Sequence, residues 1–264
     1  MILATFASAC GGGTVATTTA DADVDADRVY RPDAAPPTPD AGAPFFTYHG
    51  GRTLSSMHVA FVYIDDEAIG GAPSFDGFAD ALFASSHWST LGEYGIKPGT
   101  RTLSVRVPRS AIFPDGSIDA QGLIDQSAFG NIAQAYLHGT NGPRFPGADA
   151  TVFFLPAKVN IVLGQRGSYK WRTCWDADAF HSTDGIGDAY IVIPPCSNGR
   201  STVALSHELG ETATDPDVYT AWYAESEQFR SGGELSDLCD KSISTSFGYQ
   251  VGRYWSESQR RCTP

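Results

Sequence analysis

Residues 189–216, AYIVIPPCSNGRSTVALSHELGETATDP, place a strand pattern directly before a helix pattern. The segment 189–195 is rich in aliphatic residues and ends in two prolines, which predicts a strand that stops there. The residues that follow predict a helix from about Thr202 to Ala213, because Pro216 disfavours helical backbone at the residue before it. Small and apolar residues flank the charged centre of this helix, so we expect it to be buried.

The rest of the chain, from about Phe45, mixes strand and helix patterns. Further strands are expected at 57–64, at 102–109 and, around a turn, within 151–164. Helices are expected in 75–95, ending near Trp88, and in 117–139, from a cap at Ser117 or Asp119 to Gly139. We therefore predict one domain over residues 45–264, α/β or α+β, and the order H-E-x-x-E at 207–211 indicates that it is zincin-like. In it the motif-bearing helix packs on a central mixed sheet.

The bulk composition limits the partners. The chain has 264 residues, is 42% hydrophobic and carries a formal charge of −12. Such a charge opposes binding to phosphate backbones, so a nucleic-acid partner is not expected. No apolar run approaches the roughly 20 residues of a membrane-spanning helix. We expect a monomer.

The first residues resemble an export signal. MILATFASAC (1–10) has an apolar run and small residues before Cys10, as at a lipobox, where the cysteine receives a lipid. Residues 11–44 are rich in Ala, Asp, Thr and Pro, which predicts a disordered acidic tether. We expect a secreted or lipid-anchored protein of the cell envelope, which contacts the membrane only through a lipid on Cys10.

Four of the five cysteines lie in the predicted domain. An even number of cysteines in an exported domain predicts two disulfides. Three pairings are possible, and proximity in the sequence favours Cys174–Cys196 with Cys239–Cys262. A zinc site built on thiolates is the rival interpretation, but it lacks a C-x-x-C pair.

The helix carries His207, Glu208 and Glu211 in the order H-E-x-x-E, one letter away from the zinc-protease signature H-E-x-x-H. Residues four apart lie on one helical face, so His207 and Glu211 can both reach one metal ion. Zinc binds both histidine nitrogen and carboxylate oxygen. Glu208 would then act as the general base that accepts a proton from the metal-bound water. The carboxylate in place of imidazole makes the ion a weaker Lewis acid and favours somewhat harder ions. The competing interpretation is a helix whose charges are only solvated.

A third ligand has to come from elsewhere in the chain. The acidic segment SGGELSDLCD (231–240) offers Asp237 and Glu234 beside a predicted disulfide cysteine. Asp215 lies eight residues after His207, just before the proline that ends the helix. We favour Asp237, then Asp215, then Glu234. Zinc is the predicted ion.

Two further side chains are candidates for stabilising an oxyanion. Tyr223 follows the motif, and His181 lies in a predicted disulfide-bonded loop before the strand at 189–195. A structural role in the loop is the alternative for His181. His49 in TYHGG is expected to be a turn or packing residue.

Several of these motifs, in this order, resemble the EXORDIUM-like (phosphate-responsive) proteins. They are TYHGG (47–51), VAFVYI (59–64), SHWSTLGEYG (86–95), the cysteine-bearing block CWDADAFHS (174–182) with AYIVIPPC (189–196), and ALSHELGETATDP (204–216). The resemblance covers residues 45 to 264 in patches. It implies an extracellular or wall-associated protein and no defined reaction.

Two functions therefore compete. The first is an extracellular zinc-dependent metallopeptidase or other metallohydrolase that acts on a peptide or protein. The second is a non-catalytic envelope protein of the EXORDIUM-like type, which binds cell-wall polymer and has a structural or vestigial metal site. Hydrolysis of carbohydrate by Glu208 and Asp237 as paired carboxylates is a third possibility.

Overall fold

The computed structural model describes residues 46–65, 75–139, 145–166, 168–184, 186–224, 233–239 and 242–263. The predicted signal remnant with Cys10 and the predicted tether at 11–44 lie outside these ranges. Asp240, the last acidic residue of the predicted ligand segment, also lies outside them.

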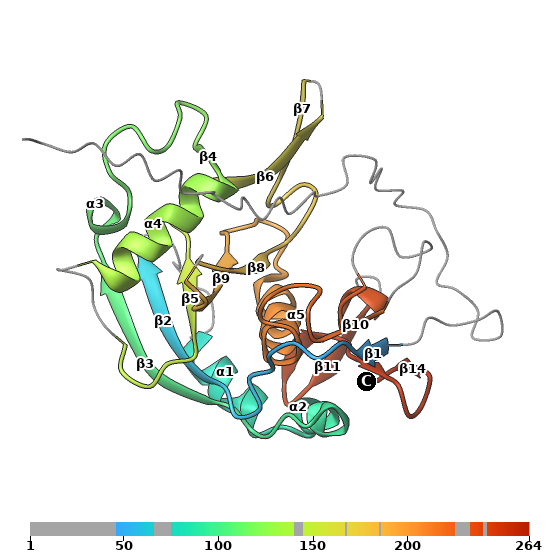
Figure 1. The fold of residues 1–264 in the computed structure, drawn as a ribbon. Coiled ribbons are helices and arrows are strands. Elements are labelled where there is room, and N and C mark those ends of the chain that lie inside the picture. The colour runs from blue at the N-terminus through green and yellow to red at the C-terminus, as the bar shows by residue number, and fades with distance from the viewer. Residues whose placement is uncertain are drawn as a thin grey trace, which may run out of the picture.

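A five-stranded sheet in the order β3-β2-β5-β9-β8 lies at the centre of the fold (Figure 1). Four strands run parallel: β2 (His58–Ile64), β3 (Thr100–Val107), β5 (Ala150–Phe154) and β9 (Ala189–Ile193). The fifth, β8 (Phe180–Thr183), pairs antiparallel with β9. The sheet is therefore mixed, and the predicted α/β class is confirmed.

Helices cover both faces of this sheet, which is why its inner strands read as continuous apolar runs. Along β2, Phe61 and Tyr63 point into one core, whereas Val62 and Ile64 point into the other. The first core is closed by α1 (Phe75–Phe83), α2 (Ser86–Ser89), the 3-10 helix η2 (Thr90–Tyr94) and α5 (Ser201–Thr214). The second core is closed by α3 (Arg109–Ile112) and α4 (Gln126–His138) (Figure 1).

The remaining strands form small sheets around this centre. A three-stranded sheet has the order β4-β6-β7, with β4 (Leu123–Asp125), β6 (Asn160–Arg166) and β7 (Tyr169–Arg172). Three antiparallel pairs join β1 (Phe46–Tyr48) with β10 (Trp222–Ala224), β11 (Ile243–Ser246) with β12 (Tyr249–Gly252), and β13 (Trp255–Ser256) with β14 (Arg261–Cys262). The short η3 (Asp237–Cys239) precedes β11.

The helix predicted for 117–139 begins later than expected. Asp119 does not cap it: its Oδ1 accepts the backbone N–H groups of Gln121 and Leu123, which closes a turn. Gly122 continues that turn with a φ of 82°, a conformation that favours glycine. The N-cap is instead Asp125, whose side chain accepts the Ser127 N–H.

Two other element predictions also need correction. The helical pattern in 75–95 is broken into α1, α2 and η2, because Ser85 accepts the Trp88 N–H and starts a new helix. The two strands expected around a turn within 151–164 belong to different sheets, since β5 is in the central sheet and β6 is not.

The helix α5 is buried on nearly all sides, as its small and apolar flanks predict. It packs on β8 and β9 beneath it and on β12 beside it. Gly210 is required there, because a Cβ at this position would lie 2.6 Å from the Tyr254 ring. Tyr254 also donates its hydroxyl to the Ser206 carbonyl at 2.7 Å. This packing fixes the rotation of α5, and hence the direction of its charged side chains.

Both predicted disulfides are present, Cys174–Cys196 and Cys239–Cys262. Two disulfides in one domain indicate an oxidising, extracellular type of environment. Among the described residues, no helix has the length and apolar character needed to cross a membrane.

Candidate metal centre

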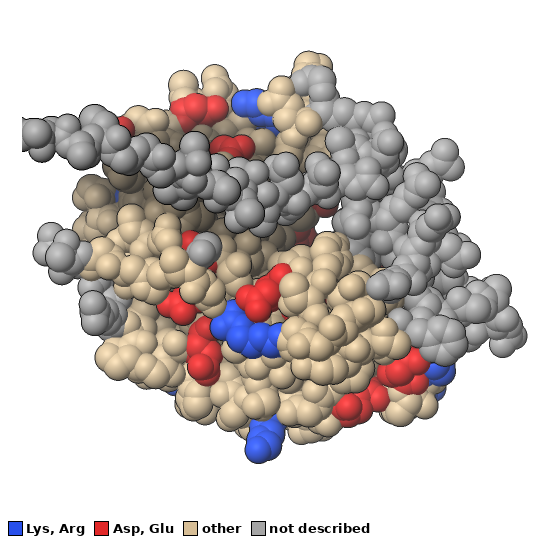
Figure 2. All heavy atoms as spheres, in the orientation of Figure 1, with Lys and Arg blue, Asp and Glu red and all other residues tan. Residues whose placement is uncertain are grey.

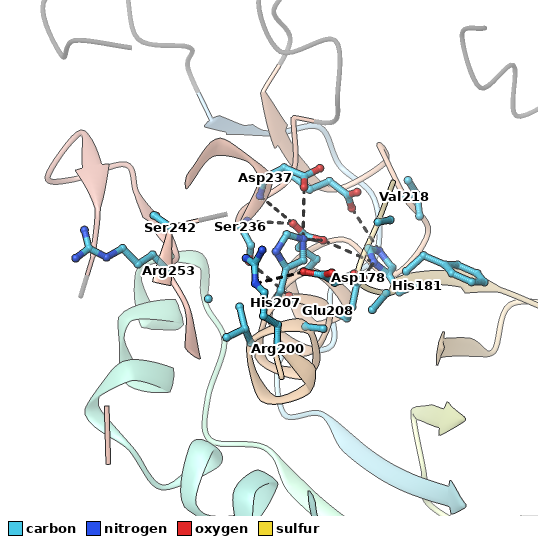
Figure 3. A pocket seen from close by; sticks show the side chains of 18 of the residues that line it. Asp178, His181, Arg200, His207, Glu208, Val218, Ser236, Asp237, Ser242 and Arg253 are labelled. Atoms are coloured by element: carbon cyan, nitrogen blue, oxygen red, sulfur yellow. Dashed lines mark hydrogen bonds and ion pairs between the residues drawn. The ribbon is translucent and has the colours of Figure 1, made fainter. Parts of the chain in front are cut away.

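Three segments bring the chemistry-bearing residues together around one cavity of about 310 Å³. The helix α5 supplies His207, Glu208 and Glu211, and β8 supplies His181. The third segment, 233–239, supplies Glu234 and Asp237. In Figure 3, Asp237 and His207 point toward each other, and Glu208 makes its contact with His181 beside them.

The orientation of His181 follows from strand register. His181 pairs with Ile191 across β8 and β9, and directly opposite residues place their side chains on the same face. Ile191 belongs to the core that α5 closes. His181 therefore points toward α5, where it is 6% exposed. The loop position predicted for His181 is therefore wrong, because His181 lies in the antiparallel edge strand of the central sheet.

The acidic segment is bonded directly to the helix. Glu211 Oε1 accepts the backbone N–H of Ser236 at 3.1 Å and that of Asp237 at 3.2 Å. The Cys239–Cys262 disulfide holds the end of the segment, and Trp255 donates its N–H to the Leu235 carbonyl. Asp237 is thus presented to α5 by a backbone that is held from both sides.

His207, Glu211 and Asp237 form the first group with metal-ligand geometry, with one ligand atom of each within 4.8 Å of the others. His207 Nε2 lies 3.1 Å from Glu211 Oε2 and 3.4 Å from Asp237 Oδ1. Tetrahedral zinc with bonds of about 2.1 Å separates its ligand atoms by about 3.4 Å. The donor types and their spacing therefore fit zinc. His207 remains 24% exposed at the cavity, whereas Glu211 is 3% exposed.

His181, Glu208 and Glu211 form a second group, in which all three residues are buried. His181 Nδ1 lies 3.1 Å from Glu208 Oε2 and 3.9 Å from Glu211 Oε2. On its other side, His181 Nε2 lies 3.2 Å from the Asp215 carbonyl oxygen and 3.3 Å from Glu234 Oε1. Glu234 Oε1 is buried and accepts no hydrogen bond from the described residues.

Charges in this cavity shift one another's pKa. Burial alone would lower the pKa of both histidines, but the neighbouring carboxylates outweigh it. Glu234 and Glu208 raise the pKa of His181 well above its ordinary value, and Glu211 and Asp237 do the same for His207. Burial raises the pKa of Glu234 to about 8, against the opposing effect of His181. Without metal, the carboxylates therefore favour the protonated form of both histidines, whose charge balances part of the acidic charge.

Asp215, the second candidate for the third ligand, has a structural role instead. Its carboxylate accepts the backbone N–H groups of Thr220 and Ala221 and the Thr220 hydroxyl, at 2.9 to 3.2 Å. These bonds shape the turn that follows α5. The carbonyl of Asp215, and not its carboxylate, reaches the site, where it lies against His181.

Tyr223 is not brought to the cavity wall, which Tyr219 and Val218 line instead among the described residues. Tyr223 lies in β10 and stacks on His49 with ring centroids 3.8 Å apart, so His49 has the packing role expected of it. The wall also includes Phe180, Arg200 and Arg253. Their positions in the sequence give no sign of this, because tertiary packing alone brings them to the cavity.

Charged side chains on the face shown in Figure 2 lie in small groups among uncharged residues.

A third group, His138 with Asp184 and Asp188, lies away from this cavity. His138 Nε2 is 2.6 Å from Asp184 Oδ2, which is the length of a direct hydrogen bond. Two ligands of one zinc ion lie farther apart, at about 3.4 Å. We therefore interpret this group as an ion pair that ties the end of α4 to the loop between β8 and β9.

Comparison with protein-family models, with curated proteins and with solved structures found no match to this chain. The resemblance to EXORDIUM-like proteins stays a prediction from motifs.

Proposed function

We propose that this protein is a zinc-dependent hydrolase that cleaves peptides or proteins outside the cytoplasm. The observation that carries the proposal is the convergence of His207 Nε2, Glu211 Oε2 and Asp237 Oδ1 beside Glu208 in the wall of one cavity. Two of these ligands are the ones that the motif predicts, with a carboxylate in place of the second histidine, and Asp237 is the third ligand favoured from the acidic segment.

His207, Glu211 and Asp237 would hold the zinc ion. Bound zinc supplies a Lewis acid, which lowers the pKa of water from about 16 to about 7 and polarises a substrate carbonyl. Three protein ligands leave a coordination position open, as catalytic zinc sites require. His207 and Asp237 are both partly exposed at the cavity, so substrate can reach this position.

We assign to Glu208 the role of accepting the proton of the attacking water. Its Oε2 lies 3.1 Å from His181 Nδ1, so this carboxylate has a fixed orientation. In the proposed reaction, the water oxygen bonds to the carbonyl carbon and its proton moves to Glu208. Glu208 then gives that proton to the leaving nitrogen as the carbon–nitrogen bond breaks. His181 is therefore a positioning residue in this step.

The test combines two measurements on Glu208→Gln. We expect the variant to keep its zinc and to lose activity on a peptide library by about 10²–10⁴-fold in kcat, the contribution of a general base. Asp217→Asn is a matched control, because its carboxylate pairs with Arg52 and lies outside the ligand groups. Equal activity in Glu208→Gln and wild type would remove Glu208 as the base. Zinc bound with no hydrolysis by wild type would favour the non-catalytic envelope protein.

A further inference from the structure

The two ligand groups on α5 share a single atom. Glu211 Oε2 lies 3.1 Å from His207 Nε2 on one side and 3.9 Å from His181 Nδ1 on the other. Glu211 Oε1 is occupied by the backbone N–H groups of Ser236 and Asp237, so the carboxylate cannot rotate freely. A carboxylate fixed between two histidines in this way has the geometry of a bridge between two positions.

The ring of His181 is oriented as a metal ligand. Its Nε2 faces the Asp215 carbonyl oxygen at 3.2 Å, and a carbonyl can only accept, so Nε2 carries the hydrogen. Metal-bound histidines are held in the same way, by a hydrogen bond from the ring nitrogen that is not bound to the metal. In the neutral ring, Nδ1 is then an acceptor, and it faces the carboxylate oxygens of Glu208 and Glu211. In the metal-free protein a hydrogen bond joins Nδ1 to Glu208 Oε2, and a divalent ion that takes the place of that proton would meet three ligand atoms facing one another.

The charge of the cavity supports a second ion. Glu208, Glu211 and Glu234 have side chains 7%, 3% and 9% exposed, and Asp237 is 28% exposed. These four carboxylates carry a charge of −4 when ionised. Buried carboxylates are costly unless cations compensate them, and a second divalent ion would supply compensation beyond that of the first.

We propose that α5 holds two divalent ions, which share Glu211 Oε2. The first position is that of the proposed function, with His207, Glu211 and Asp237. The second position consists of His181 Nδ1, Glu208 Oε2 and Glu211 Oε2. This inference rests on the proposed function for its first position. It adds a regulatory consequence: a Glu208 carboxylate that binds an ion is unable to accept a proton, so filling the second position inhibits hydrolysis.

The test is a zinc titration followed by native mass spectrometry, on the full chain with its disulfides intact. We expect one zinc per chain at low free zinc, a second at higher zinc, and activity that rises with the first and falls with the second. His181→Gln should bind only the first ion. His138→Gln is the matched control, since it removes a histidine from the separate ion pair with Asp184, and it should still bind two.

Each result has one meaning. No zinc in the wild type would overturn the proposed function and this inference together. A single zinc at saturation would overturn only the second position. Two ions in a folded His181→Gln variant would also overturn it, because His181 is then not a ligand. If that variant does not fold, zinc-edge X-ray absorption on the saturated wild type decides. A zinc–zinc distance of about 3.5–4 Å is expected for a shared ligand, and the lack of one would contradict the proposal.

Discussion

Asp237 donates its backbone N–H to Glu211 Oε1 at 3.2 Å, so the segment that carries one acidic ligand is bonded to the helix that carries the other. The same Glu211 presents Oε2 to His207 at 3.1 Å. The proposed ligand set is therefore held by backbone as well as by side chains, which is the pre-organisation that metal binding without rearrangement requires.

Asp237 and Asp215 should respond differently to loss of their charge. We expect Asp237→Asn to weaken zinc binding with little effect on stability, because this side chain is partly exposed. Asp215→Ala should keep zinc at the first position. It should lower the free energy of unfolding by at least about 1.5–3 kcal/mol, since it removes hydrogen bonds to a buried charged group. Urea unfolding and zinc titration of both variants give the comparison. Loss of the first zinc in Asp215→Ala alone would reverse these assignments.

Removal of the two disulfides should lower stability in both cases but should affect zinc affinity differently. They close loops with sequence separations of 22 and 23 residues, so the chain-entropy model gives each about 3 kcal/mol of stability. Only Cys239–Cys262 holds the segment with Asp237. The double variant Cys239→Ser with Cys262→Ser should therefore lose zinc affinity as well as stability. The pair Cys174→Ser with Cys196→Ser, measured in parallel, should lose stability with a smaller loss of zinc affinity.

Zinc binding should release protons. The pKa of His207 is raised in the metal-free protein, where burial opposes the shift and Glu211 and Asp237 outweigh it. Since zinc needs the unprotonated ring, its affinity should fall as pH drops below this raised pKa. The stability of the metal-free protein depends on pH in the opposite direction. A raised folded pKa stabilises the protein fully below the unfolded pKa, near 6.5, and this gain is lost as pH rises through the folded value. Calorimetry in buffers of different ionisation enthalpy counts the protons.

Gly210→Ala tests the packing that orients α5. The added Cβ would meet the Tyr254 ring at 2.6 Å, so we expect a loss of about 1–3 kcal/mol from overpacking. Gly77→Ala is the control within α1, where a Cβ meets nothing within 4 Å. That change should stabilise the protein by about 0.4–1 kcal/mol. Thermal unfolding reports both, and a stabilised Gly210→Ala would show that Tyr254 can move aside.

Local patterns in the sequence were sufficient for the strand β9, the buried helix after it and both disulfide pairs. They failed at Asp119, because an Asp before an apolar run can either cap a helix or close a turn. Here Gly122, with its positive φ, allows the turn. The H-E-x-x-E spacing indicates which side chains of α5 share a face. It does not indicate that His181 faces them, because that depends on the pairing of β8 with β9. The EXORDIUM-like resemblance and the activity both stay predictions.

The most direct measurement of the central claim is the zinc affinity of His207→Ala beside that of the wild type, by competition with a chelator at low free zinc. His207 is the one histidine of the first position. Its loss should therefore lower the zinc affinity of that position by more than the roughly 10–100-fold lost when a residue that only hydrogen-bonds a ligand is replaced. A wild type that binds one zinc, with a folded His207→Ala variant that does not, is the result the structure predicts. Equal zinc affinity in the two proteins would contradict the first metal position, which consists of His207, Glu211 and Asp237.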